Sequence, residues 1–172
     1  MRRSSISNTD KVIDSRDVIE RIAELRADAD ATIEAAKTAR ERIKELDGDG
    51  MAELPEDDQE ERDNLSNSLW TAEDETELTD SMDMDDYTEL LALEKLAVEG
   101  EATTSEWADG AGLIHEDHFQ DYAEELAEDI GAIDKNAKWP LSHIDWEAAA
   151  DELKQDYSTL DFDGETYYVR DC

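Results

Sequence analysis

The sequence HEDHFQDYAEELAEDIG, residues 115–131, and the sequence WPLSHIDWEAAADELKQDYSTLDFDGETYYVR, residues 139–170, decide the fold of this chain. In the first stretch, apolar residues recur at helical spacing and predict one buried helix face, made of Phe119, Tyr122, Ala123, Leu126, Ala127 and Ile130. Gly131 follows directly, where the left-handed cap of a helix C-terminus is expected.

The second stretch begins with a helix signal and then changes period. Asp145 is the expected N-cap, and the predicted buried stripe of this helix is Trp146, Ala149, Ala150 and Leu153. Residues 157–162 and 165–170 are β-rich runs joined by Asp163-Gly164, which is a strong signal for a hairpin. The two stretches therefore predict helix, helix and β-hairpin, with a further short strand near residues 110–114.

The side of the first helix opposite its apolar face is acidic. Four carboxylates follow one another at i, i+4 spacing, with two more beside them, and the six are Asp117, Asp121, Glu124, Glu125, Glu128 and Asp129. Each like-charged pair in the row costs roughly 0.2–0.5 kcal/mol of helix stability, so three pairs cost on the order of 1 kcal/mol. No Lys or Arg occurs between Lys95 and Lys135. An ordinary solvated face usually interleaves basic residues, so the row favours a functional surface over a solvated one.

These stretches resemble the C-terminal part of the ArdA antirestriction proteins. The resemblance lies in F-x-D-Y-A-E-E-L-A-E-D-I-G at 119–131, in H-I-D-W-E-A-A-A-D-E-L at 143–153, and in D-Y with an aromatic hairpin ending V-R at 156–170. ArdA proteins are DNA mimics encoded by phages and mobile elements, and they occupy the DNA-binding groove of type I restriction–modification enzymes. The resemblance covers about the last third of the chain, and no tandem copy of the module precedes residue 102. It implies an inhibitor that performs no chemistry.

The net charge of −34 and the sequence pI near 4.1 restrict the partners. Phosphate contacts need Lys and Arg, so direct binding to nucleic acid or to an anionic membrane is not expected, whereas a basic protein partner is. Residues 1–46 hold ten acidic and ten basic side chains, residues 47–101 hold 21 and two, and residues 102–172 hold 19 and four. The acidity is therefore local, which argues against a general halophilic bias.

Charge and resemblance together predict a DNA mimic that inhibits a host DNA-binding defence enzyme, foremost a type I restriction–modification enzyme. Duplex DNA carries one charge per roughly 1.7 Å, so 34 charges correspond to roughly 58 Å of duplex. The six carboxylates above would imitate phosphates, and Glu147, Asp151, Glu152 and Asp156 would extend the field. The alternative is a phage structural or adaptor protein in which acidity serves steering and assembly uses the N-terminal helix. A divalent-ion buffer is a third hypothesis.

The N-terminal part predicts one long helix. Residues 1–12 are Ser-rich and expected to be mobile, and Asp14 is the expected N-cap. The 3–4 spacing after it predicts a coiled-coil seam, comprising Val18, Ile22, Leu25, Ala29, Thr32, Ala36, Ala39, Ile43 and Leu46. A helix from 14 to 46 would be about 50 Å long. The seam would pair either with a second copy, giving a homodimer, or with a later helix of the same chain.

Three segments follow from these patterns: a charge-balanced helical arm at 1–46, an acidic connector with one or two helices at 47–101, and an ArdA-like acidic α+β module at 102–172. The connector begins with a turn at 47–50, continues with a helix over 56–70, and has a disordered stretch at 71–80. A firmer helix is expected over 81–99, ended by Gly100. Its apolar side would be Tyr87, Leu90, Leu91, Leu93, Ala97 and Val98. The expected fold class is thus mostly helical α+β.

The sequence offers no catalytic, cofactor or metal site. His115 and His118 lie at i, i+3 without a third ligand at a familiar spacing, so a capping or surface role is expected for them. No nucleophile elbow, Walker loop or dinucleotide loop is present. The single Cys172 gives no disulfide framework, and neither a signal peptide nor a membrane-spanning run is found. These features predict a protein without enzymatic activity in the cytoplasm, which is the host cytoplasm if a phage encodes it.

Overall fold

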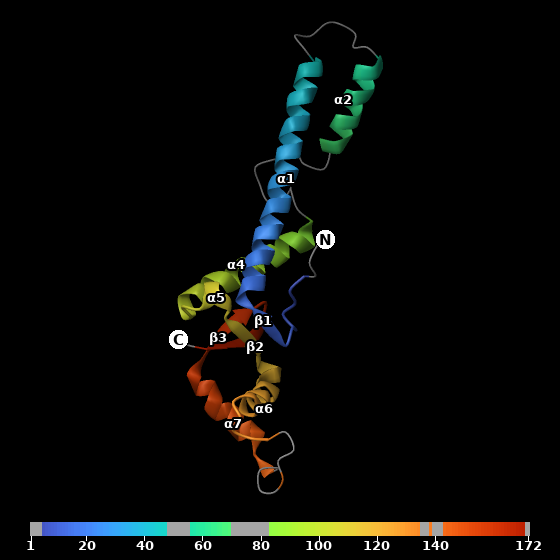
Figure 1. Cartoon of the computed structure of the whole chain (residues 1–172). Helices are drawn as coiled ribbons and strands as arrows, with labels where there is room; N and C mark the ends of the chain where they lie inside the picture. The colour runs from blue at the N-terminus through green and yellow to red at the C-terminus, as the bar shows by residue number, and fades with distance from the viewer. Residues whose placement is uncertain (1–4, 48–55, 70–82, 135–137, 139–142, 171–172) are drawn as a thin grey trace. The chain divides into compact units, whose positions relative to one another are not determined.

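The computed structural model describes residues 5–47, 56–69, 83–134, 138 and 143–170. Within them the chain is a mostly helical α+β protein with one long N-terminal helix and a small antiparallel sheet, which confirms the predicted fold class (Figure 1). Two compact units are formed, one by residues 1–22 with 91–172 and the other by residues 23–90. The start of the chain thus belongs with its C-terminal part.

The first unit is built on a four-stranded antiparallel sheet. Its strand order is β1-β2-β4-β3, with bounds Val12–Asp14, Gly112–His115, Glu165–Arg170 and Tyr157–Phe162 in that order. Phe162 pairs with Glu165 across the turn, and Asp163 and Gly164 have φ of 50° and 87°. Both turn residues are left-handed, as a two-residue turn of type I′ requires, so the predicted hairpin is confirmed.

Strand β1 was not predicted from the sequence. Val12 and Ile13 pair with Ile114 and Leu113 of β2, although residues 1–12 were expected to be mobile. The segment before β1 is also bound to the hairpin, because the Tyr167 hydroxyl donates to the Asp10 carbonyl oxygen at 2.8 Å and the Asn8 side chain donates to the Asp163 carbonyl oxygen at 3.1 Å. For residues 7–12 the expectation of mobility is therefore wrong.

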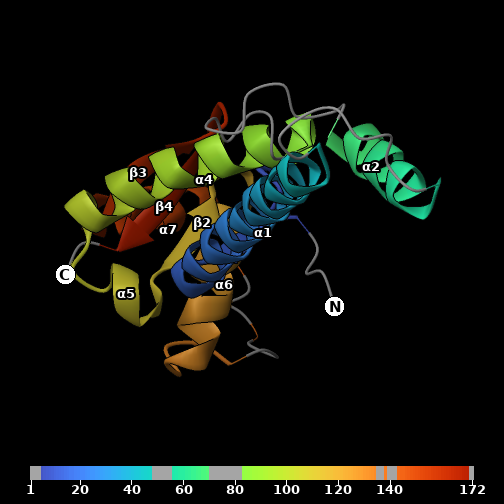
Figure 2. The same ribbon diagram turned by 90° about the horizontal axis from the view of Figure 1, so that it is seen from above.

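Helices cover both faces of this sheet. Helix α6, Phe119–Asp129, and helix α7, Trp146–Leu153, pack on one face around Ile114, Phe119, Ala123 and Ala150. The other face carries Leu113, Tyr167 and Val169, because they alternate along the strands with residues of that cluster. These three side chains are 0–1% exposed. Figure 1 and Figure 2 show the start of helix α1, Ser15–Asp47, and the end of helix α4, Met84–Thr103, on this second side.

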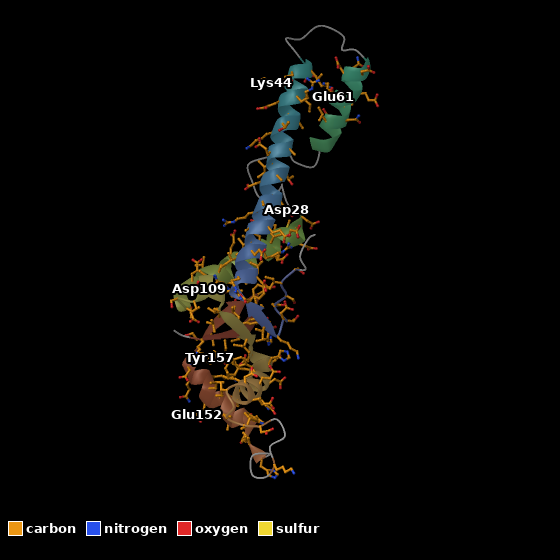
Figure 3. The ribbon with its side chains drawn as sticks, viewed as in Figure 1. Asp28, Lys44, Glu61, Asp109, Glu152 and Tyr157 are labelled. Carbon is orange, nitrogen blue, oxygen red and sulfur yellow. The ribbon has the colours of Figure 1, made fainter. Side chains whose placement is uncertain are left out.

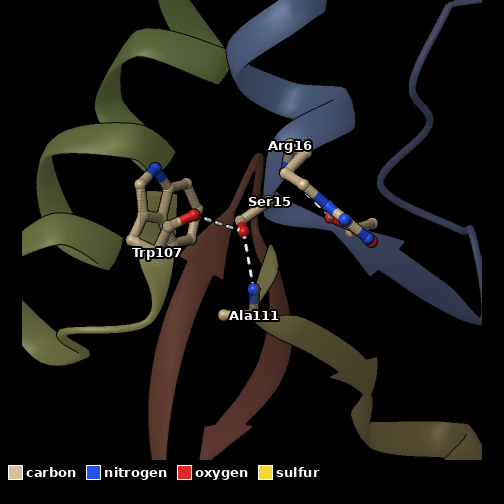
Figure 4. Close-up of polar contacts among 5 residues, drawn as sticks. Ser15, Arg16, Trp107 and Ala111 are labelled. Carbon is tan, nitrogen blue, oxygen red and sulfur yellow. Dashed lines mark hydrogen bonds and ion pairs between the residues drawn. The ribbon is translucent and has the colours of Figure 1, made fainter. Parts of the chain in front are cut away.

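Helix α1, Ser15–Asp47, begins in the first unit at a capped and buried start. Asp14 is its N-cap, as predicted, since the Asp14 carboxylate accepts from the Arg16 amide at 2.9 Å. The Ser15 hydroxyl donates to the Trp107 carbonyl oxygen at 2.6 Å and accepts from the Ala111 amide at 2.7 Å (Figure 4). These two bonds join the start of α1 to helix α5, Trp107–Gly110, and to the chain entering β2.

Helix α4, Met84–Thr103, does not end at Gly100 as predicted. Gly100 lies inside the helix and is buried beneath the Trp107 indole, where a Cβ atom would come within 2.1 Å of the ring. The helix thus continues because the absent side chain makes room for Trp107. Its buried side is Leu90, Leu93, Leu96 and Gly100, whereas Leu91 and Val98, which were predicted to be on the apolar side, are 49% and 70% exposed.

We expect Gly100→Ala to destabilise the protein by about 1–3 kcal/mol through overpacking against the buried Trp107 ring. Helix propensity alone predicts the opposite sign, a gain of about 1 kcal/mol. Urea unfolding measures the difference. Gly112→Ala is the matched control, since a Cβ atom at Gly112 meets nothing within 4 Å. The urea midpoint of this control chain should be unchanged. A Gly100→Ala chain more stable than wild type would show that Trp107 moves aside freely.

The second unit contains the rest of α1, helix α2, Glu56–Leu69, and the start of α4. The Arg42 guanidinium forms a two-pronged ion pair with Glu61 at 3.0 and 3.2 Å, and Arg62 pairs with Asp47 at 2.5 Å. The late part of the predicted seam therefore has a neighbouring helix of the same chain, while the homodimer stays a prediction. The predicted turn after Asp47, Trp70 and the predicted disordered stretch at 71–80 lie outside the described residues.

Candidate partner-binding surface

The predicted acidic residues of the first helix occupy one side of α6 and the turn before it. We call this set the α6 acidic face, defined as Asp117, Asp121, Glu124, Glu125, Glu128 and Asp129. Five of the six side chains are exposed and Glu128 is partly buried. Asp117 lies in the 3₁₀ turn η1, Glu116–His118, rather than in α6, so the predicted unbroken helical row begins only at Asp121.

The apolar side of α6 fixes the direction in which this face points. Phe119 and Ala123 are buried against the sheet and Tyr122 packs beside them. The carboxylates, displaced by half a turn, consequently face away from the core. Ile130 is an exception to the predicted stripe, because it follows the last helical residue and is 71% exposed. Gly131 has φ of 72°, which confirms the predicted left-handed cap.

The second set of predicted carboxylates lies on the neighbouring helix of the same layer. Glu147, Asp151 and Glu152 are on α7, and Asp156 is in the turn η3, Lys154–Asp156; all four are exposed. Figure 3 labels Glu152 on α7. Asp145 caps α7 as predicted, accepting from the Ala148 amide at 3.1 Å. All ten predicted residues thus belong to the layer on one side of the sheet. Exposed Glu116 was missed, although it directly precedes Asp117 in the sequence.

Lys154 is a cation within this layer whose placement the sequence did not reveal. Its ammonium group lies 5.8 Å from the centre of the Phe119 ring and 5.3 Å from that of Tyr168, and it is 3.5 Å from Asp151. Its side chain is only 26% exposed. Cation–π contacts hold Lys154 toward the core, so its charge is partly drawn away from the exposed carboxylates. Of the predicted set, Asp151 is the one that this lysine partly neutralises.

The aromatic side chains beneath α6 and α7 form a structural cluster. The hydroxyls of Tyr122 and Tyr157 are hydrogen-bonded at 2.9 Å, and Phe119 contacts Tyr122, Tyr157 and Tyr168. Burial and the bond with Tyr122 raise the pKa of Tyr157 well above its usual value. On the other sheet face, burial raises the pKa of Tyr167 to about 12. Both phenols therefore stay protonated at neutral pH and act as packing groups.

The two tyrosine shifts predict a loss of stability at alkaline pH. A tyrosine in the unfolded chain ionises near pH 10, so between about pH 10 and 12 the unfolded chain binds fewer protons than the folded one. The free energy of unfolding should consequently fall as pH rises through this window. Urea midpoints measured from pH 9 to 11.5 check the slope. The Tyr167→Phe chain should have a lower urea midpoint than wild type at pH 9, but its midpoint should fall less steeply as pH rises. An unchanged pH slope would contradict a raised pKa at Tyr167.

His115 has the capping role that the sequence led us to expect. It is 6% exposed, and its Nδ1 atom accepts from the Asp117 amide at 3.1 Å, which caps η1. Its Nε2 atom lies 3.6 Å from a Glu165 carboxylate oxygen, and its ring meets Tyr167 edge-on at 5.1 Å. In the described part of the chain, no group of three or more His, Cys, Asp and Glu residues is placed to hold a metal ion.

No helix among the described residues is both long and apolar enough to cross a membrane. No family model, curated protein or solved structure matches the chain.

Proposed function

We propose that this protein is an acidic DNA mimic that inhibits a host DNA-binding defence enzyme by occupying its DNA-binding groove. The observation that carries the proposal is the α6 acidic face. Five of its six carboxylates are exposed, the six lie on one side of α6 and its preceding turn, and no Lys or Arg is interleaved among them in the sequence. A helix accepts this repulsion only at a cost in stability, which a cationic partner would offset.

The density of charge on α6 supports mimicry of a phosphate backbone. Asp121 and Asp129 are eight residues apart, which is about 12 Å along the helix axis. Five carboxylates of the α6 acidic face fall within this distance, or about one per 2–3 Å. Duplex DNA carries one charge per roughly 1.7 Å and one of its strands one per roughly 3.4 Å, so the helix falls between the two. A groove lined by Lys and Arg that binds phosphates would meet a similar field.

The mechanism is competitive occupancy, and no bond is made or broken. The acidic field steers the protein to a basic groove, and the carboxylates then take the place of phosphate oxygens on Lys and Arg side chains. The resemblance of residues 119–170 to ArdA proteins supports type I restriction–modification enzymes as targets. The charge itself supports any basic DNA-binding groove. On this proposal the protein acts in the cytoplasm of the cell that holds the enzyme.

A DNA-competition assay tests the proposal directly. A type I restriction–modification enzyme, labelled duplex and this protein are mixed at about 50 and 200 mM salt. We expect stoichiometric displacement of the duplex, and weaker binding of the protein to the enzyme at the higher salt. An adaptor protein that binds through apolar contacts would keep its partner affinity as salt rises. Undisplaced duplex at both salt concentrations would refute inhibition of this class of enzyme.

A further inference from the structure

The outer side of α4 in the first unit carries a short apolar stripe that is largely exposed in the described part of the chain. Leu91 is 49% exposed and Val98 is 70% exposed. The two are seven residues apart, so they lie almost above one another on the helix. Exposed Lys95 and Ala102 continue the same side. The buried residues Leu93, Leu96 and Gly100 lie on the opposite side of the helix, toward the sheet.

Carboxylates border this stripe along both edges. At 100° per residue, Glu94 and Glu101 fall on one side of the line from Leu91 to Val98, and Glu99 falls on the other. Lys95, the basic residue of the stripe, is paired with Asp161 of β3 at 2.5 Å, and that pairing raises its pKa. The stripe therefore has an apolar centre, a neutralised lysine and acidic edges. Figure 2 shows α4 passing over β3 and β4, whereas α6 and α7 cover the other face of the sheet.

We propose that the outer side of α4 from Leu91 to Ala102 is a docking surface for a basic amphipathic helix of a partner protein. Exposed leucine and valine at heptad spacing match the apolar face of an approaching helix, and the bordering carboxylates match Lys or Arg on its flanks. A second copy of α4 is disfavoured as occupant, because its own acidic edges would face these carboxylates at close range. This surface is separate from the α6 acidic face and does not depend on its function.

The test uses the full chain and a synthetic probe. The probe is a fourteen-residue peptide of leucine and lysine with its leucines on one helix face, and a scrambled isomer of equal charge accounts for attraction to the net charge alone. We expect the wild-type chain to bind the amphipathic peptide about tenfold more tightly than the isomer in fluorescence anisotropy. Replacing both residues, Leu91→Gln with Val98→Gln, should remove that difference. Ile130→Gln, which changes another exposed apolar residue, should leave it intact.

Two results would overturn the proposal. Equal binding of both peptides by the wild-type chain would show attraction by net charge only, and a preference that survives the double replacement would show that the amphipathic peptide binds elsewhere on the chain. Self-association in analytical ultracentrifugation that the double replacement abolishes, without any preference between peptides, would assign the stripe to a second copy of the chain. Circular dichroism of the double variant checks that α4 is retained, which is expected because both side chains project from the helix into solvent.

Discussion

Replacing the six carboxylates of the α6 acidic face by their amides should weaken displacement of duplex from the target enzyme by about a hundredfold or more at physiological salt. The substitutions are Asp to Asn at 117, 121 and 129, and Glu to Gln at 124, 125 and 128. Amides keep the shape of the side chains and remove six of the chain's acidic charges. If the partner contacts all six carboxylates, the plot of log affinity against log salt concentration should also become less steep. Its slope should fall in magnitude by up to about five.

The same replacement should leave the fold intact or slightly more stable. Removing the repulsion among like charges at i, i+4 returns on the order of 1 kcal/mol to the helix. The buried side of α6, with Phe119 and Ala123, is untouched. Thermal unfolding followed by circular dichroism checks this point. A loss of inhibition with an unchanged or higher melting temperature would therefore reflect the surface and not the fold.

A control variant with six other carboxylates replaced separates the effect of the α6 acidic face from the effect of net charge. Exposed acidic residues away from α6 and α7 can be changed to amides in the same way, namely Asp30, Glu41, Glu101, Glu106, Asp109 and Asp163. Both variants then carry the same net charge. We expect the control to retain most of the inhibition. If both variants displace duplex equally weakly, the effect comes from total charge. If the variant of the α6 acidic face still inhibits fully, that face has no part in the mechanism.

Local patterns predicted the parts of the fold that local interactions determine. The hairpin follows from Asp163-Gly164, because only residues that tolerate positive φ allow a two-residue turn of this type. Helices α6 and α7 follow from their apolar stripes and from the cap at Asp145. Exposure of the predicted acidic surface follows from the same stripes, since a residue opposite a buried face is exposed.

Long-range packing decided what the sequence did not reveal. Gly100 follows a long apolar helix and has the pattern of a terminator, but Trp107, seven residues later, packs against it and keeps it helical. Helix α4 has apolar residues on both sides, so periodicity could not tell buried Leu96 from exposed Val98. Lys154 is contained in an acidic segment, and only the fold places it over Phe119. Strand β1 has three residues, too few for any period to be visible.

Strand β1 leads to a prediction about the isolated C-terminal module, residues 102–172, which should not fold on its own. The fragment lacks the strand that pairs with β2 and the helices that cover the second face of the sheet. It would expose side chains that are 0–3% exposed in the whole chain, Leu113, Leu160, Tyr167 and Val169. Burying such side chains is worth about 1.5–3 kcal/mol each, so about 6–12 kcal/mol is lost, which equals the stability of a typical domain.

Two proteins check this prediction by the dispersion of their amide NMR signals. The fragment 102–172 should give the narrow dispersion of an unfolded chain. A chain in which residues 23–90 are replaced by a Gly/Ser linker of about twenty residues should give a folded spectrum, because it keeps residues 1–22 with 91–172 as one compact unit. A well-dispersed spectrum from the fragment would show that its two helices and hairpin suffice. If the prediction holds, the α6 acidic face is formed only when the start of the chain has joined the sheet. Deletions at the N-terminus should then abolish inhibition, although they remove no acidic residue from that face.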